Sequence, residues 1–384
     1  MSASPLPTTS SDRLVFVDIF RGLAVAGMIL VDNPGSDDKA YWAIKHAPWN
    51  GWTPADFIFP SFLLLVGVSL VYSITRRLER GDTRLAIMSH VAKRSLALIA
   101  IGLFVNTFPF VDLHFSTLRF YGVTQRIAVC YFVAAILLLW TDRRALWMAL
   151  IFCLVGYWIV LRFVPVPGFG IPGRDIPFMD PDRNIAAWLD RKLMMGHLYN
   201  ITRDPEGLLS TIPSIATTLI GVLTGYWLRS EKKPIMKVTL LTIAGVLGML
   251  TGFIWDIRFP INKNLWTSSF VLFTGGFALL FLSFLYWAVE MKKIRRIWTM
   301  PALVFGMNAI AGFVADSFVY GPGYNFTARG PNGVSAMWHE VAYDRLLALG
   351  GSPTIASLIY SVAAVLFCWI LLWLLWRKRI FIKI

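Results

Sequence analysis

One short stretch of the sequence combines a histidine and an aspartate in a spacing suited to proton transfer. His46 and Asp56 flank a turn rich in tryptophan, proline and glycine, Ala47-Pro48-Trp49-Asn50-Gly51-Trp52-Thr53-Pro54-Ala55. An unperturbed imidazole titrates near neutral pH, so His46 could act as a base that a carboxylate orients. Asp56 would equally serve as the N-terminal cap of a following helix, and both functions remain open at this stage.

Other polar side chains occur inside or beside apolar segments. The pair Asp32-Asn33 closes the first of these segments, and further polar residues within the segments are Asp18, Arg21, Asn106, Gln125, Arg126 and Asn308. Each costs free energy in hydrocarbon, so each is expected to face a partner or a water-filled cavity. Asp18 and Arg21 are three residues apart on one helix face and are expected to form an ion pair.

Arg126 has no carboxylate near it in the sequence. A guanidinium in an apolar segment predicts either an anionic ligand or a pair with a distant acid such as Asp56 or Asp316. The sequence leaves these two possibilities open.

The elements that position these residues are membrane helices. The chain has 384 residues, of which 57% are apolar and only 15% charged, and its mean hydropathy is +0.62. A soluble domain carries about a quarter charged residues, so the composition excludes a soluble enzyme and a disordered chain. The three cysteines lie in apolar runs and cannot form a disulfide scaffold.

Ten apolar segments predict an all-α, polytopic helix bundle of about ten transmembrane helices in a single domain, residues 1–384. A helix needs about 20 residues to cross the hydrocarbon core, and most segments come close to that length. The segments are 14–32, 56–75, 95–107, 120–140, 145–161, 208–228, 238–255, 266–289, 299–318 and 354–376.

Charge in the loops predicts the orientation. Alternate loops, 62 residues in total, contain 21 Lys and Arg, whereas the other set, 126 residues, contains 13. By the positive-inside rule the basic set is cytoplasmic. Both termini are then cytoplasmic, residues 1–13 form a short cytoplasmic tail, and the long loops 162–207 and 319–353 face outward. The net charge of +14 thus reports topology, and no nucleic-acid partner is predicted.

Three further observations bear on architecture and chemistry. Pro60-Ser61 with Gly67-Val68 is echoed, with one gap, by Pro213-Ser214 with Gly221-Val222, which is compatible with a parallel repeat or with chance. The long outer loops contain enough Gly and Pro to be ordered without regular structure. The sequence has no GxGxxG, P-loop, HExxH or Cys/His cluster, so no metal is predicted.

Five blocks in order along the chain resemble heparan-α-glucosaminide N-acetyltransferase and its bacterial relatives. The first runs from Val17-Asp18-Ile19-Phe20-Arg21-Gly22 through the His46–Asp56 turn to Phe59-Pro60. The others are Gly122-Val123-Thr124-Gln125-Arg126, Asp204-Pro205-Glu206-Gly207-Leu208-Leu209, Asn262-Lys263-Asn264-Leu265-Trp266-Thr267 and Gly306-Met307-Asn308.

The resemblance implies a membrane enzyme that takes acetyl from cytoplasmic acetyl-CoA, a co-substrate, and delivers it to the amino group of a glucosamine across the membrane. The family's active-site histidine matches His46, and its functional asparagine falls on Asp32, with Asn33 next to it. That position is a departure from the family pattern. The short segment before the first span fits a bacterial form with a small sugar substrate, active at the periplasmic side of the inner membrane.

The same blocks supply the remaining candidate residues. The catalytic set comprises His46, Asp56, Asn33 and Asp32. Candidates for binding the co-substrate are Arg126, Gln125, Lys263, Asn264, Ser268 and Asn308. Candidates for binding the sugar are Trp49, Trp52, His197 and Glu206, where the tryptophans would equally form an interfacial belt and His197 would equally be structural.

Three other functions remain compatible with the sequence. An amino-sugar transporter would use ten spans and buried polar residues without acetyl-CoA. The same acyl transfer could act on a lipid-linked sugar or a glycan end. A purely structural membrane subunit would leave the grouping of His46, Asn33 and Asp56 unexplained. Expected partners are the amino sugar or glycan end and membrane lipid, and the resemblance makes a homodimer possible.

Overall fold

The computed structural model describes residues 14–111, 114–294, 299–330 and 335–382, and over these ranges nearly all of the regular secondary structure is helical. The predicted all-α fold is confirmed. The predicted cytoplasmic tail, residues 1–13, lies outside the described residues.

The helices follow the predicted apolar segments. The third begins earlier than predicted, and the ninth is divided into two helices. The main helices are α1 (Val15–Asp32), α2 (Ile58–Glu79), α3 (Arg84–Thr107), α4 (Val123–Trp140), α5 (Arg143–Phe163), α6 (Ile185–Met194), α7 (Thr211–Arg229), α8 (Pro234–Asp256), α9 (Ser268–Leu285), α10 (Thr299–Met307), α11 (Ala309–Asn325), α12 (Trp338–Ala348) and α13 (Pro353–Arg377). Short helical turns are η1 (Trp42–Ile44), η2 (Pro54–Phe57) and η3 (Tyr286–Met291), and the strands β1 (Thr327–Arg329) and β2 (Ser335–Met337) form a hairpin.

The described part of the chain is an integral membrane bundle. Eight of its helices are long and apolar enough to cross a membrane, and the bent pair α10–α11 is a ninth candidate. Helix α1 is not among them because its 18 residues include three charged side chains, Asp18, Arg21 and Asp32. Its core position, with ten buried residues, places it inside the bundle all the same.

The ninth predicted span is not one straight helix. Residues 299–318 were expected to cross as a single segment, but α10 and α11 meet at Asn308 with a bend of 90°. The Asn308 amide bonds a distant segment here: its Nδ2 atom donates to the carbonyl of Ile380 at 3.2 Å, and its Oδ1 atom accepts from Ile382 N at 2.9 Å. The segment after α13 is therefore held against the break.

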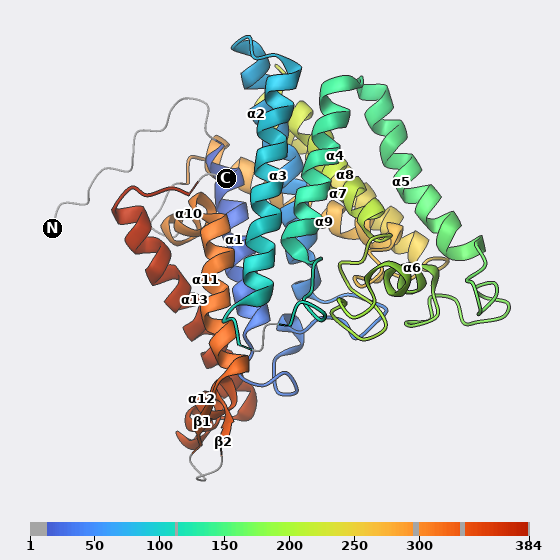
Figure 1. Cartoon of the computed structure of the whole chain (residues 1–384). Helices are drawn as coiled ribbons and strands as arrows, with labels where there is room; N and C mark the ends of the chain where they lie inside the picture. Colours follow the sequence, from blue (N-terminus) through green and yellow to red (C-terminus); the bar gives the residue numbers. More distant parts are fainter. Residues whose placement is uncertain (1–13, 112–113, 295–298, 331–334, 383–384) are drawn as a thin grey trace.

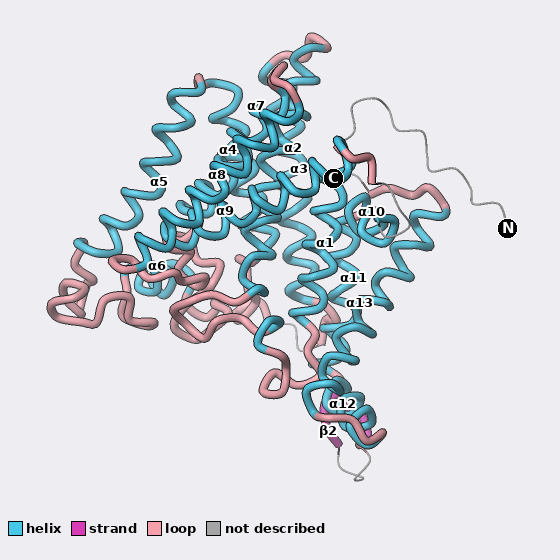
Figure 2. Tube along the Cα trace, turned by 180° about the vertical axis from the view of Figure 1, so that it is seen from behind, coloured by secondary structure: helices cyan, strands magenta, loops and turns pink. Residues whose placement is uncertain are grey.

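The two sets of loops lie at opposite ends of the bundle (Figures 1 and 2). Of the loops predicted to face outward, 162–207 with α6 and the described part of 319–353 with α12 and the hairpin lie at the lower end in Figure 1. The expectation that the long loops lack regular structure was wrong. Asn184 caps α6 by accepting a hydrogen bond from Ala187 N at 2.9 Å, and Ile185, Ala186 and Ala187 are buried against the bundle.

Glycines bring the central helices into backbone contact. A methyl group on Gly67 of α2 would overlap the carbonyl oxygen of Thr218 in α7, and one on Gly221 of α7 would overlap the carbonyl oxygen of Leu64. The two glycines that the sequence echo aligned therefore face each other across one helix pair. Gly22 of α1 and Gly306 of α10 make a second contact of this kind. Such small residues let membrane helices approach closely.

We predict that Gly67→Ala destabilises the bundle by about 1–3 kcal/mol, because the added methyl group forces α2 and α7 apart. The matched control is Gly156→Ala in α5, where a methyl group would meet only Phe152 at 3.8 Å or more. The thermal midpoint of the detergent-solubilised protein should fall for Gly67→Ala and stay level or rise for Gly156→Ala. Equal midpoints would contradict a backbone contact at Gly67.

Candidate functional site

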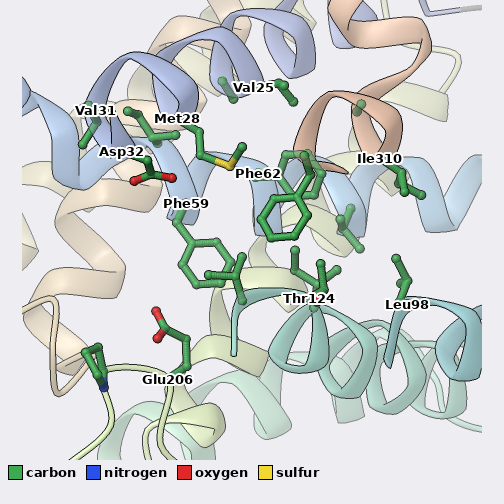
Figure 3. Close-up of a pocket in the computed structure, with 18 of the residues that line it drawn as sticks. Val25, Met28, Val31, Asp32, Phe59, Phe62, Leu98, Thr124, Glu206 and Ile310 are labelled. Carbon is green, nitrogen blue, oxygen red and sulfur yellow. The ribbon is translucent and has the colours of Figure 1, made fainter. Parts of the chain in front are cut away.

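A cavity of about 840 Å³ lies among α1, α2, α3, α4 and the α10–α11 pair, within the range of small-molecule sites. Its outer end is lined by the polar residues Asp32, His46, Arg119, Tyr199, Asn200, Arg203, Glu206, Lys263 and Asn264. Its middle is apolar, with Met28, Phe59, Phe62, Leu98 and Ile310 (Figure 3). Arg21, Ser69, Arg94, Tyr131 and Ile382 line the remainder.

The cavity runs along the bundle axis. In α1, Arg21 precedes Asp32 by eleven residues, which corresponds to about 16 Å at 1.5 Å per residue. Figure 3 shows the carboxyl groups of Asp32 and Glu206 at the same end, separated from Leu98 and Ile310 by the phenylalanine rings. An apolar middle therefore separates the end that contains these carboxyl groups from the other end of the cavity.

His46 lies at the outer end between an acid and a base. Its Nδ1 atom is 2.8 Å from Asp56 Oδ1, and its Nε2 atom is 2.9 Å from Lys263 Nζ. The Asp56 side chain is fully buried, whereas the imidazole is 40% exposed to the cavity mouth. This arrangement orients the ring and leaves it accessible to a ligand. The predicted proximity of His46 and Asp56 is confirmed by their contact.

The turn between these residues is fixed by the Asp56 carboxylate. Asp56 Oδ2 accepts hydrogen bonds from Ala47 N at 3.2 Å, Thr53 N at 2.9 Å and Thr53 Oγ1 at 3.1 Å. The bond from Thr53 N belongs to a capping box at η2, in which the Thr53 side chain accepts in turn from Asp56 N. Both functions considered for Asp56 in the sequence are therefore present together, because one oxygen caps the helix and the other bonds His46.

Lys263 comes from a loop that braces the His46 turn. Gly51 N donates to the carbonyl of Ile261 at 2.7 Å, and Asn262 Nδ2 donates to Asn50 Oδ1 at 3.1 Å. Asn262 Oδ1 in turn accepts from Leu265 N at 2.8 Å. Burial lowers the pKa of Lys263 even though carboxylates surround it. Asn262 was not among the predicted site residues, although it lies within the block Asn262–Thr267 that resembles the family.

Asp32 and Asn33 point in different directions at the end of α1. Asp32 lines the cavity. Asn33 is buried, and its Nδ2 atom donates to Ile29 O at 2.9 Å and to Asp316 Oδ1 at 2.6 Å. Because an amide nitrogen has two hydrogens, these bonds use its donors, and Asn33 does not line the cavity.

Arg119 organises a group of acids that the sequence analysis missed in part. Its guanidinium bonds both oxygens of Asp204, at 2.5 and 2.9 Å, and Glu206 Oε2 at 2.6 Å. It also lies 4.8 Å from the centre of the Tyr199 ring. Burial opposes the charge, but the bonds to Asp204 and Glu206 outweigh it and raise the pKa of Arg119. The partners are 85 and 87 residues away, so no local pattern links them.

Four residues predicted to bind the co-substrate lie outside the cavity lining. Arg126 is fully buried, and its Nη2 atom bonds Ser210 Oγ at 2.5 Å and the carbonyls of Pro205 and Gly207. The remaining three are Gln125, Ser268 and Asn308, which bond Thr124, the Leu154 carbonyl and the segment 380–382. Arg126 thus contacts carbonyl and hydroxyl oxygens through Nη2, whereas its buried Nε and Nη1 atoms have no hydrogen-bond partner among the described residues. Lys263 and Asn264 do line the cavity.

Three predicted sugar contacts also lie outside the cavity lining, and Glu206 alone of that set is part of it. Trp49 donates from Nε1 to the Met179 carbonyl at 3.0 Å. Trp52 packs against Phe57 and Phe273. His197 stacks on Phe120 with 4.2 Å between ring centres, and its Nδ1 atom lies 2.7 Å from the Leu118 carbonyl.

The far part of the cavity contains two arginines. Arg21 Nη1 bonds Asp18 Oδ1 at 3.2 Å, which confirms the predicted ion pair, and its Nη2 atom donates to Ser69 Oγ at 2.7 Å. Arg94 lies 5.2 Å from the centre of the Tyr131 ring. Arg94 was not predicted to line a site, because it belongs to a basic cluster that membrane topology alone explains. Within the described ranges, no group of three His, Cys, Asp or Glu side chains could hold a metal ion.

Comparison with known proteins decides the family. The family model described as heparan-alpha-glucosaminide N-acetyltransferase, catalytic, matches residues 13–255. The chain belongs to this family. It is 33% identical over 356 residues to a heparan-alpha-glucosaminide N-acetyltransferase of Homo sapiens, which covers 79% of the chain and 52% of that protein. A Mus musculus protein of the same name is 32% identical over 370 residues, covering 82% of the chain and 55% of that protein.

The chain thus spans about half the length of the curated relatives it matches. The region matched by the family model includes His46, Asp56 and the 204–207 block. Lys263 and Asn264 lie beyond it, and the structure brings them to the same cavity end. The family relationship confirms the resemblance seen in the five sequence blocks.

We predict that Arg119→Met lowers stability by about 3 kcal/mol, because it leaves the Asp204 and Glu206 carboxylates without their buried partner. The control is Arg183→Met, whose pair with Asp180 is half exposed on the arginine side and is worth about 0–1 kcal/mol. Thermal midpoints in detergent would compare them. Similar losses in both variants would rule out a special contribution from the Arg119 cluster.

Proposed function

We propose that this chain is a membrane N-acetyltransferase that takes acetyl from acetyl-CoA on the cytoplasmic side and transfers it to the amino group of a glucosamine-type sugar on the periplasmic side of a bacterial inner membrane. The observation that carries the proposal is one cavity with the Asp56–His46 pair at one end and Arg21 and Arg94 toward the other. The name of the relatives describes the same type of transfer on a glucosaminide.

The polarity of the cavity fits the parts of acetyl-CoA. The molecule combines anionic phosphates, a flexible arm with amide groups, and a thioester at its far end. Arg21 and Arg94 offer positive charge for the phosphates. The apolar middle, with Phe59 and Phe62, excludes water from the arm. This orientation brings the thioester to His46, at the other end of the cavity.

His46 has the geometry of a general base or of a transient acetyl carrier. Asp56 fixes the imidazole through Nδ1, so Nε2 is the atom that would react. A neutral donor for the developing oxyanion is available in Asn264, which lines the same end of the cavity. Asn33 is not proposed for this role because its donors are occupied by Ile29 and Asp316.

The acceptor would be recognised at the outer mouth. Asp32 and Glu206 present carboxylates to the cavity from two sides (Figure 3), and carboxylates attract the ammonium form of an amino sugar. Tyr199, Asn200 and Arg203 add hydrogen-bonding groups for hydroxyls. Asp32, which departs from the family pattern, would then bind the amine of the sugar.

We predict that His46→Ala lowers acetyl transfer by 10²–10⁴-fold, the usual contribution of a positioned general base. Proteoliposomes would receive labelled acetyl-CoA on one side and glucosamine on the other, and labelled N-acetylglucosamine would be counted. The control is His114→Ala, an exposed histidine on the same side of the bundle, which should keep full activity.

Two outcomes of this experiment would contradict the proposal. Product formation that survives His46→Ala would keep the transferase but exclude the role of His46. Glucosamine uptake by the wild type without acetyl-CoA, and without product, would instead indicate an amino-sugar transporter.

We predict that Arg94→Gln raises KM for acetyl-CoA about tenfold with little change in kcat, because a charged contact to a phosphate contributes about 1.5–3 kcal/mol. Lys93→Gln is the matched control, since it removes the same charge from the adjacent, exposed position of α3. Initial rates over a range of acetyl-CoA concentrations give both constants. Equal KM values for the two variants would place the phosphates elsewhere.

A further inference from the structure

The contact between Lys263 and His46 couples the protonation of the two side chains, because one of them has to donate and the other to accept. Lys263 Nζ is 2.9 Å from His46 Nε2. An ammonium group has three hydrogens to donate and cannot accept. When Lys263 is an ammonium group, Nε2 is therefore the acceptor, and Nδ1 carries the ring hydrogen that Asp56 Oδ1 accepts at 2.8 Å. A doubly protonated imidazole would set two positive charges and two donors against each other.

This pairing raises a difficulty for the proposed chemistry. The lone pair of Nε2, which would take a proton or an acetyl group, already accepts a hydrogen bond from Lys263. The reaction also has to deliver a proton to the departing sulfur, since an anionic thiolate in a largely apolar cavity is costly. Lys263 is the group placed to resolve both, because loss of its proton frees Nε2.

Charges around Lys263 permit such a proton transfer. Asp56 Oδ1 is 4.0 Å from Nζ, and the other charged groups that act on the lysine are Asp32, Glu206 and Arg126. Burial lowers the pKa of Lys263, and Arg126 adds to this effect, while the three carboxylates oppose it. The ammonium form is therefore held less firmly than that of an exposed lysine.

We infer that Lys263 is a second catalytic residue, which carries the proton from the acceptor amine to the sulfur of CoA. The inference rests on the proposed function. As the carbon–sulfur bond breaks, Lys263 gives one proton to sulfur, and the product is CoA thiol with neutral Nζ. In direct transfer, the amine forms the new carbon–nitrogen bond, His46 Nε2 takes the amine proton, and the imidazolium passes it to Nζ.

The same balance holds if His46 carries the acetyl group. Nε2 attacks the thioester carbonyl while Lys263 protonates the sulfur. The amine then attacks acetyl-imidazole, its proton goes to neutral Nζ, and the imidazole leaves unprotonated. In both routes one amine and one thioester give one amide and one thiol, and Lys263 ends as it began. The inference does not depend on which route operates.

The test compares Lys263→Met, which removes the proton, with Lys263→Arg, which keeps the charge but cannot give up a proton. Both should lower kcat by 10²–10⁴-fold, with KM for acetyl-CoA within about threefold of wild type. Lys45→Met is the control: it removes a cation from the His46 loop whose Nζ atom bonds the exposed Asp38 carbonyl, and it should keep wild-type activity.

A pH profile provides a second measurement. In the wild type, kcat should fall at high pH as Lys263 loses the proton that it must deliver, and this alkaline fall should be absent from the residual activity of Lys263→Met. Thermal midpoints and equilibrium binding of acetyl-CoA to each variant separate lost chemistry from lost folding.

The outcomes are distinguishable. An active Lys263→Arg, or an alkaline fall that persists in Lys263→Met, would reduce Lys263 to a charge that orients His46 and overturn the inference. An inactive wild type would instead contradict the proposed function itself. Loss of kcat in both variants with intact acetyl-CoA binding supports the proton transfer.

Discussion

A carboxylate buried at the entrance of a membrane helix must be fully hydrogen-bonded, and the way in which Asp56 meets this requirement shapes the candidate site. Its two oxygens accept four hydrogen bonds, from His46, Ala47 and twice from Thr53. These bonds close the turn, start the helix and set the face of the imidazole that meets the cavity. The second loop, with Lys263, packs against the same turn through backbone and amide contacts. One local requirement thus places groups from two distant parts of the chain.

The sequence was most informative where a feature is local. The lengths of the apolar runs predicted the helices, and the separation of His46 and Asp56 around a rigid turn made their contact one of the two possibilities considered for Asp56. Boundaries were less certain: α3 begins at Arg84, after its Thr83 cap, well before the predicted start at residue 95. The break at Asn308 was not predictable from hydropathy, because the residues on both sides are equally apolar and the bend depends on bonds to residues 380–382.

Contacts between residues that are distant in the sequence could not be predicted from it. The sequence gives no indication that Lys263 lies against a ring 217 residues earlier, or that Arg119 joins Asp204 and Glu206. For Arg126, the expectation that a buried charge needs partners was correct, but the observed partners are not those that were considered. Carbonyl oxygens and a serine hydroxyl accept hydrogen bonds from its Nη2 atom, whereas its Nε and Nη1 atoms have no such partner among the described residues. Backbone carbonyls are present in every sequence, so their use leaves no signature. Residue type predicts that a partner is needed, whereas only the fold identifies it.

The glycine contacts have a consequence for how quickly the molecule can work. Helices α2 and α7, and likewise α1 and α10, touch backbone to backbone, so neither pair can slide without breaking a close-packed interface. Rigid-body rocking of two halves, which takes microseconds to milliseconds, would have to disrupt them. Entry and exit of small molecules are then left to side-chain rotations and loop movements, which occur in picoseconds to microseconds. Such a bundle can admit and release ligands at its cavity while its helical frame stands still.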